Sequence, residues 1–248
     1  MGIAPGEVGV HRMLPVENIP HDLPVFDGIK PSKIDHLLGC FNARLVELDA
    51  GEPITAWDGT PGFAACLLSG RAIVCAYDEE GNRTIMHEFA PGQALCCRES
   101  VSLPLLRELD VVACAPSRVL YFNVPDATLR SDNCVMCTKM VLGNLALSMA
   151  SLNAELMVTM DIRRRRTTRG KLIAYLEYEA QRHGASSFDV TLNRQELADY
   201  LCIDRAALSR ELSALHDEGQ LDYDHSHFEL HLRPRAPRPR RGVRPASC

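Results

Sequence analysis

One long stretch without helix-breaking residues constrains the fold of this sequence more than any other feature. From Asp126 to Ile162 the chain contains no proline and only one glycine, Gly143. Apolar residues recur along it at alternating steps of three and four, and Thr138 and Thr159 fill the remaining steps. The apolar members of this heptad pattern are Val135, Leu142, Leu145, Met149, Leu152 and Leu156. The pattern predicts one long helix whose apolar seam pairs with a second copy or, alternatively, packs against its own domain.

The sequence before this helix has a different period. Between Ala43 and about Pro125, short apolar runs alternate with turn residues. The runs are RLVEL, AACLLSG, RAIVCAY, RTIMHEFA, DVVACA and RVLYFNV. The segment YDEEGNRTI is typical of a hairpin tip in which Gly81 takes a positive φ. Strands of this length and spacing predict an antiparallel barrel or sandwich.

Charge is distributed unevenly along the chain. Residues 1–162 carry 11 Lys and Arg against 20 Asp and Glu, a net charge of −9, whereas residues 163–248 carry 16 against 12, a net charge of +4. The basic part opens with arginines at 163–166 and 169 and ends in the tail RPRAPRPRRGVRPASC. This tail cannot bury a core, so we expect it to be disordered. The asymmetry indicates that only the C-terminal part approaches a polyanion; uneven but solvated charge is the alternative.

The segment TLNRQELADYLCIDRAALSRELSALHDEGQLDY has the spacing of two short helices joined by a tight turn. Asn193 and Glu196 form a capping-box pattern at the start of the first helix, and Asp204 is a good N-cap for the second. The expected inner faces are Leu197, Ala198 and Leu201, then Leu208, Leu212 and Leu215. Two helices joined in this way form a helix-turn-helix, whose second helix presents its first outward residues to DNA bases. An ordinary helical hairpin with exposed arginines has the same spacing.

The stretch NRQELADYLCIDRAALSREL resembles the helix-turn-helix of the CRP/FNR family of bacterial transcription regulators. The family pattern is matched at three places: the R-Q-E sequence at the start of the first helix, two arginines in the second helix, and the S-R pair. The resemblance implies a DNA-binding set of Arg194, Gln195, Arg205, Ala206, Ser209 and Arg210. Ala206 stands where the family usually has a base-reading glutamate, so the usual half-site does not carry over.

The resemblance extends to the order of the parts. It implies an α+β fold: an N-terminal antiparallel, jelly-roll-like β-barrel sensor domain over residues 1–125, a long dimerisation helix and hinge over 126–166, a winged helix-turn-helix domain over 167–232 and the disordered tail over 233–248. The dimer helix would contribute Leu142, Leu145, Met149, Leu152 and Leu156. We therefore expect a cytoplasmic homodimer that regulates transcription on a palindromic double-stranded operator, with RNA polymerase as a candidate partner.

The segment that holds cyclic AMP in some family members has lost its motif here. The alignment of PGQALCCRESVSLPLLRELDVVACA puts Cys96 and Cys97 on the family's Gly-Glu pair, and Arg107 and Glu108 on its Arg-Ser pair. A thiol is a poor acceptor for a ribose hydroxyl, and an ionised Glu108 would repel a phosphate. The sequence thus argues against cyclic AMP and leaves the effector and any cofactor unidentified. With Arg98, these residues form a candidate pocket for another small molecule, a redox-sensing thiol site, or thiols that only fill space.

A C-x-x-C pair, Cys134 and Cys137, lies near the start of the long helix. Residues three apart share a helix face, but two thiols are only half of a closed metal site. We predict no metal, with a site shared between two chains as the alternative.

Other functional classes find little support. The ten cysteines are diluted over 248 residues, as in a reducing compartment. No uninterrupted apolar run approaches the ~18 residues of a membrane span, so none is predicted. The sequence has no glycine-rich phosphate loop, nucleophile elbow or H-E-x-x-H helix, and we do not expect an enzyme. The rival hypothesis is a small-molecule, metal- or redox-sensing module whose DNA role is weak or lost.

Overall fold

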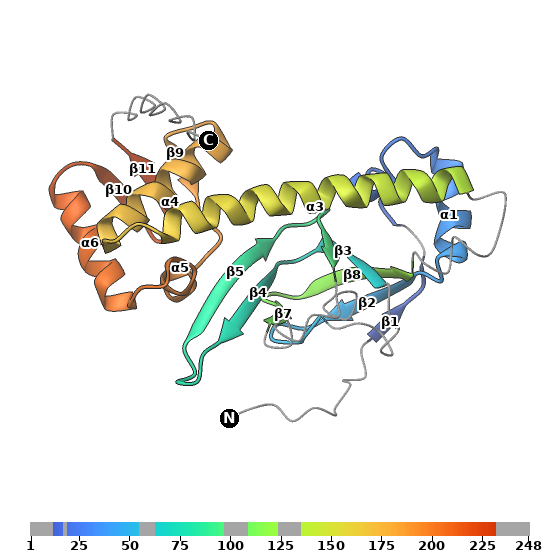
Figure 1. Cartoon of the computed structure of the whole chain (residues 1–248), viewed down its shortest axis with the longest axis horizontal. Helices are drawn as coiled ribbons and strands as arrows, with labels where there is room; N and C mark the ends of the chain where they lie inside the picture. Colours follow the sequence, from blue (N-terminus) through green and yellow to red (C-terminus); the bar gives the residue numbers. More distant parts are fainter. Residues whose placement is uncertain (1–11, 17–18, 55–62, 97–108, 124–134, 232–248) are drawn as a thin grey trace, which may run out of the picture. The chain divides into compact units, whose positions relative to one another are not determined.

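The computed structural model describes residues 12–16, 19–54, 63–96, 109–123 and 135–231 (Figure 1). The chain divides into two compact units, Met1–Asp161 and Ile162–Cys248. The long helix α3 (Val135–Arg163) belongs to the first unit except for its last two residues. The predicted long helix is therefore present.

In the described part of the first unit, two antiparallel sheets form the framework. Their strands are β1 (Arg12–Leu14), β2 (Arg44–Leu48), β3 (Phe63–Ser69), β4 (Ala72–Tyr77), β5 (Arg83–Phe89), β6 (Ala94–Cys96), β7 (Leu109–Ala113) and β8 (Ser117–Asn123). One sheet has the order β1-β2-β8-β3-β6 and the other has the order β5-β4-β7. Each of the six apolar runs contains a strand, whereas the three-residue strands β1 and β6 were not predicted. The α+β class with an antiparallel N-terminal region is confirmed.

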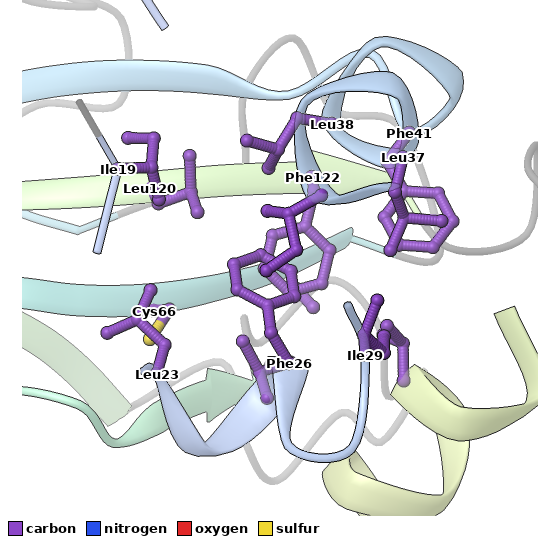
Figure 2. Close-up of a cluster of buried hydrophobic side chains, with 14 of the residues drawn as sticks. Ile19, Leu23, Phe26, Ile29, Leu37, Leu38, Phe41, Cys66, Leu120 and Phe122 are labelled. Atoms are coloured by element: carbon purple, nitrogen blue, oxygen red, sulfur yellow. The ribbon is translucent and has the colours of Figure 1, made fainter. Parts of the chain in front are cut away.

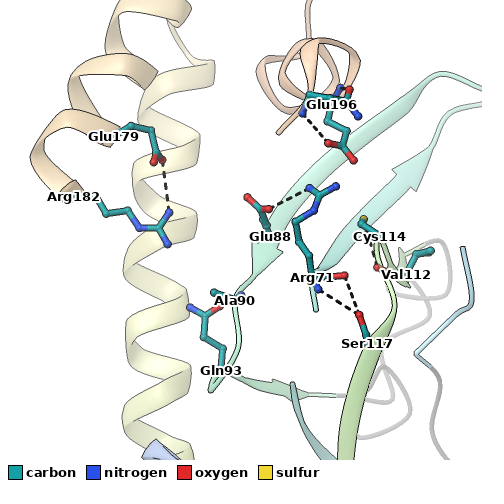
Figure 3. A network of polar contacts seen from close by, with 11 residues as sticks. Arg71, Glu88, Ala90, Gln93, Val112, Cys114, Ser117, Glu179, Arg182 and Glu196 are labelled. Atoms are coloured by element: carbon teal, nitrogen blue, oxygen red, sulfur yellow. Dashed lines mark hydrogen bonds and ion pairs between the residues drawn. The ribbon is translucent and has the colours of Figure 1, made fainter. Parts of the chain in front are cut away.

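Tight turns set the register of these strands. Gly81 has a φ of 82° at the tip of the β4–β5 hairpin, as its sequence predicts. Gly70 has a φ of 92°, and a Cβ atom there would lie 2.2 Å from Ser117 Oγ. The next residue, Arg71, donates its backbone N–H to Ser117 Oγ (3.3 Å), and its Nη1 lies 3.2 Å from Glu88 Oε1 (Figure 3). The β3–β4 turn is thereby tied to both β8 and β5.

A buried cluster joins the larger sheet to the short helices η1 (Pro24–Phe26) and α1 (Pro31–Cys40). Ten of its side chains are labelled in Figure 2: Ile19, Leu23, Phe26, Ile29, Leu37, Leu38, Phe41, Cys66, Leu120 and Phe122. The rings of Phe41 and Phe122 stack with their centroids 6.0 Å apart. Because the cluster also contains Cys137 and Val141, the start of α3 shares the same core.

One side of α3 packs against its own unit. Leu145 packs against the cluster of Figure 2, and Leu152 packs against a second core cluster formed by both sheets. The side chain of Asn144 donates to the backbone oxygens of Val25 (3.1 Å) and Asp27 (2.9 Å). The predicted heptad seam is thus divided: the row containing Leu145 and Leu152 faces the sheets, while Leu142 is exposed. Periodicity could not separate the rows, since apolar residues occur on nearly all sides of this helix.

The length and composition of α3 would also allow it to cross a membrane. The sequence analysis considered only uninterrupted apolar runs, whereas small and uncharged polar residues interrupt the apolar residues of this helix. A single helix of this kind is weak evidence for a membrane span. Its packing against two core clusters gives it a role within the fold.

The described residues of the second unit form three helices, after the end of α3, and a small sheet. The elements are α4 (Thr168–His183), β9 (Ser187–Asp189), α5 (Arg194–Leu201), α6 (Arg205–Asp217), β10 (Leu221–Asp224) and β11 (His227–Leu230). The strands form one antiparallel sheet of order β10-β11-β9. Gly184 ends α4 with a φ of 65°, a left-handed conformation that glycine adopts without strain. The order of helices followed by a β-hairpin is that of a winged helix-turn-helix.

Candidate nucleic-acid interface

The start of α5 is fixed by the capping box that the sequence predicts. The side chain of Asn193 accepts hydrogen bonds from the backbone N–H groups of Gln195 (2.9 Å) and Glu196 (3.0 Å). Glu196 Oε2 accepts in return from the backbone N–H of Asn193 at 2.9 Å. Glu196 is only 6% exposed, so its carboxylate closes the helix end inside the unit.

The turn between α5 and α6 is short and includes one left-handed residue. Cys202 has a φ of 51° and donates its backbone N–H to the carbonyls of Ala198 and Asp199. Asp204 occupies the N-cap position of α6, as predicted, but its side chain makes no capping hydrogen bond. The inner face of α6 is the predicted one, because Leu208, Leu212 and Leu215 are all buried.

With those leucines inside, α6 presents a polar face to solvent. Arg205, Ala206, Ser209 and Arg210 are exposed. Ser209 Oγ donates to the backbone oxygen of Arg205 at 3.1 Å, which leaves its oxygen able to accept. Among the residues that the structure describes, neither Arg205 nor Arg210 forms an ion pair. These two guanidinium groups are therefore available to a ligand outside the chain.

Arg194 and Gln195 are engaged within the unit instead. The Arg194 guanidinium lies over the rings of Tyr223 and Phe228, 5.1 and 4.8 Å from their centroids, and burial lowers its pKa. Gln195 Nε2 donates to Asp199 Oδ1 at 2.7 Å. Arg194 thus holds the β10–β11 hairpin against α5, a role that sequence analysis missed. The signal for it in the sequence was the pair of aromatic residues, Tyr223 and Phe228, that follows the two helices.

Two members of the arginine run also have internal partners. Arg169 Nε lies 3.1 Å from Glu211 Oε2, and Nη1 of the same guanidinium lies 3.2 Å from Glu218 Oε2. The hydrogen bonds to Glu218 and then Glu211 raise the pKa of Arg169. Arg163 donates to the backbone oxygen of Tyr200. These two residues connect helices, whereas Arg164, Arg165 and Arg166 are exposed.

Most of the predicted effector pocket lies outside the described residues. This holds for Cys97, Arg98, Arg107 and Glu108, while Cys96 ends β6 opposite Ala64 of β3. A cavity of about 250 Å³ nevertheless lies beside this strand, in the first unit. Its lining comes from the β5–β6 turn, α3 and η1: Pro24, His87, Phe89, Pro91, Gly92, Gln93, Ala94, Ser148, Ser151 and Leu152.

The chemistry of this cavity centres on His87. The side chain is buried, its ring meets Phe89 edge-on at 4.6 Å, and Nε2 lies 3.6 Å from Glu155 Oε2 of α3. Gln93 Oε1 accepts from the backbone N–H of Ala90 at 2.8 Å, which closes the β5–β6 turn at the cavity edge (Figure 3). No lysine or arginine occurs among the described residues that line the cavity. Sequence analysis missed His87 because the residue lies inside an ordinary strand pattern.

Three of the described cysteines, Cys66, Cys75 and Cys137, are buried like core residues, whereas Cys202 is exposed. Burial raises the pKa of the Cys66 thiol to about 12 and also raises the pKa of Cys75. Such thiols stay protonated near neutral pH and react slowly. Cys137 is 7% exposed and belongs to the cluster of Figure 2, while Cys134 lies outside the described residues. No group of three metal-ligating side chains occurs within the part of the chain that the structure describes.

Known proteins resemble both parts of this arrangement. Residues 170–235 match the family of Crp-like helix-turn-helix domains. The global regulator CLP of Xanthomonas campestris is 13% identical, with a TM-score of 0.63 over 81% of this chain and 99% of that one. A cyclic nucleotide-binding domain containing protein of Listeria monocytogenes is 18% identical, with a TM-score of 0.63 over 79% and 97%.

A third structure, FixK2 of Bradyrhizobium japonicum, is 19% identical and has a TM-score of 0.56 over 77% of this chain and 93% of that one. No curated protein sequence matches this chain. At these identities the solved structures establish the fold, and the match over residues 170–235 establishes the type of DNA-binding domain. The chain therefore contains a Crp-like helix-turn-helix DNA-binding domain at residues 170–235 and shares its overall fold with these solved structures.

Proposed function

We propose that this protein is a cytoplasmic homodimer that reads a palindromic DNA operator under the control of a small molecule held in its first unit. The observation that carries the proposal is the outer face of α6, where Arg205 and Arg210 are exposed without an ion-pair partner in the described chain. Arginine donates two parallel hydrogen bonds to guanine in the major groove. RNA polymerase is a further candidate partner for a regulator bound to its operator.

The reading residues are those of α6 rather than α5. We assign base contacts to Arg205, Ser209 and Arg210, and an apolar contact to Ala206. Gln195 is exposed at the start of α5 and suits a phosphate contact. We do not propose a DNA contact for Arg194, because its guanidinium is stacked on the aromatic rings of the β10–β11 hairpin.

The exposed side of α3 supports the dimer. It contains two heptad rows. One consists of Val135, Leu142, Met149 and Leu156, of which Met149 and Leu156 are half-buried, and the other consists of Lys139, Ala146, Asn153 and Met160, all exposed. Leu142 is 42% exposed and Met160 is 65% exposed, more than large apolar side chains usually are. A second α3 packed along these rows would bury them as a two-stranded coiled coil. Leu145 and Leu152, which the sequence pattern placed in the seam, would instead support the helix from the side of the sheets.

Selection of binding sites from a random-sequence duplex pool tests this function. We expect the full-length protein to enrich an inverted repeat whose half-sites are centred about one helical turn, roughly 34 Å, apart. Affinity for the selected site should fall steeply with salt, because arginine contacts release counterions from phosphates. If no sequence is enriched and all duplexes bind equally weakly, the rival function, a sensing module without operator recognition, replaces the proposal.

The cavity beside α3 is our candidate for the effector site. It is small, partly apolar and contains one buried imidazole, which suits a compact organic molecule with a single polar group. CLP of X. campestris is described as c-di-GMP responsive. Without a lysine or arginine among its described lining residues, this cavity is poorly matched to a phosphodiester.

Occupancy of the cavity can be tested by filling it. Ser151 lies at the cavity on α3, and Ser151→Trp would place an indole in that space. We expect native mass spectrometry to detect a bound small molecule in the wild-type protein and to find it missing from the variant. A molecule retained by the tryptophan variant would place the effector elsewhere.

A further inference from the structure

The carbonyl end of α5 receives an unusual set of hydrogen bonds. The last carbonyls of a helix have no partner within it, and they carry the negative end of the helix dipole. Here the backbone oxygens of three consecutive residues, Tyr200, Leu201 and Cys202, each accept from a cationic side chain. Only Ile203 and Asp204 separate these carbonyls from α6.

Arg163, the last residue of α3, supplies one of the cations. Its Nε donates to the Tyr200 oxygen at 2.7 Å, and its guanidinium lies 5.1 Å from the centroid of the Tyr200 ring. The same ring packs against Tyr175 of α4, with centroids 5.4 Å apart. A planar, delocalised cation is suited to this combination of one directed hydrogen bond and stacking on an aromatic face.

Lys171 of α4 supplies the other cation. Its Nζ donates to the oxygens of both Leu201 and Cys202 at 3.0 Å. Cys202 has a φ of 51°, a left-handed conformation that costs a side-chain-bearing residue energy unless its surroundings hold it. The lysine therefore holds the turn in the conformation from which α6 begins.

We propose that Arg163 and Lys171 form a clamp on the carbonyl end of α5 that sets the direction in which α6 presents Arg205 and Arg210, and thereby sequence specificity, without either cation touching DNA. This inference rests on the proposed function, since it assumes that α6 reads bases. It assigns Arg163 to the unit's interior scaffold, although it belongs to a run that looks like a phosphate-binding patch. Both clamp residues are positioning residues.

The same residues explain how the end of α3 could act on the reading helix. A turn of α3 about its axis would move the Arg163 guanidinium, and the hydrogen bond and ring contact would carry that displacement to the end of α5. Because α6 starts within three residues of the clamped carbonyls, a small shift there changes where Arg205 and Arg210 point. Misplacement of a base contact loses specificity, whereas general attraction to phosphates survives.

Binding measurements on four full-length proteins test the clamp: wild type, Arg163→Ala, Lys171→Met and Arg166→Ala. Each is titrated over a range of salt with the duplex selected by the wild type and with a scrambled duplex. For Arg163→Ala and Lys171→Met we expect affinity for the selected duplex to fall about tenfold or more, the size of one lost base contact. Affinity for the scrambled duplex should stay within about twofold, with an unchanged salt slope, because no phosphate contact is lost.

Arg166→Ala is the charge-matched control, since Arg166 is exposed and makes no contact with the clamped carbonyls. It should preserve the ratio of affinities for the two duplexes. Arg163→Lys provides a second test in case the alanine variant misfolds. It keeps the positive charge but cannot stack a planar group on Tyr200. It should lose part of the specificity while circular dichroism shows an intact fold.

The outcomes separate the clamp from the proposed function. If Arg163→Ala lowers binding to both duplexes and reduces the salt slope by about 0.9, Arg163 contacts a phosphate and the clamp is wrong. An unchanged ratio of affinities in Arg163→Ala and Lys171→Met would also overturn it. If the wild type itself does not distinguish duplexes, the proposed function fails first.

Discussion

Replacing Arg210 by alanine should lower affinity for the selected operator about tenfold to a hundredfold, because a bidentate arginine–guanine contact contributes about 1–3 kcal/mol of discrimination. Arg210 is exposed on α6, opposite the buried side of the helix that contains Leu208 and Leu212. Its removal therefore leaves no cavity in the core. The variant should keep its fold and its oligomeric state, and fluorescence anisotropy with selected and scrambled duplexes measures the loss.

Arg12→Ala is the matched control for this experiment. Arg12 lies on β1 in the first unit, and its side chain is 79% exposed beside Glu47. The substitution removes the same charge from the chain, so it reports the effect of net charge alone. We expect its operator affinity to remain within about twofold of wild type, as for an exposed charge outside the helix-turn-helix. If Arg210→Ala still distinguished operator from scrambled duplex as well as wild type, base reading by this residue would be excluded.

Leu142→Glu should convert the proposed dimer into a monomer. Leu142 lies on the exposed rows of α3, and pairing of two copies would bring two glutamates together in an apolar seam. An uncompensated buried charge costs about 3 kcal/mol or more, so the dimer dissociation constant should rise at least about a hundredfold. Sedimentation velocity measures it directly. Operator affinity should fall with it, since one monomer reaches only one half-site.

Leu147→Glu provides the comparison on the same helix. Leu147 is 69% exposed, but around the helix axis it lies about 140° from Leu142 and about 100° from Ala146. A glutamate there should remain hydrated in the dimer and leave the sedimentation coefficient unchanged. Should Leu147→Glu dissociate the protein while Leu142→Glu does not, the dimer would use a different face of α3.

The helix-turn-helix was the part most completely predicted from sequence. The capping box of Asn193 and Glu196 and the inner leucines of α6 are local features, because each depends on residues within three or four positions along the chain. The six longer strands were predicted for a similar reason, since their apolar runs end at turn residues such as Gly70 and Gly81. Strands β1 and β6 were not, because three residues carry too little pattern to recognise.

The functional residues that sequence analysis missed are defined by contacts across long sequence separations. Arg194 looked like a DNA contact, but its position is set by Tyr223 and Phe228 of the hairpin. His87 and Glu155 are far apart in the chain and meet only because β5 lies beside α3. No local pattern encodes such pairs.

The sequence alone determined the order of the helical and strand segments, the apolar period of each segment and the ends of the helices. These features depend on backbone propensity and on residues that are near neighbours in the chain. Tertiary structure alone decided which of two apolar rows of α3 remains exposed and which arginines point outward. The physical reason is that burial and pairing are properties of the assembled surface. An apolar helix face has the same sequence pattern whether it packs on the core of its own chain or on a partner. A cationic side chain likewise has the same sequence neighbours whether it binds backbone carbonyls of its own chain or a ligand.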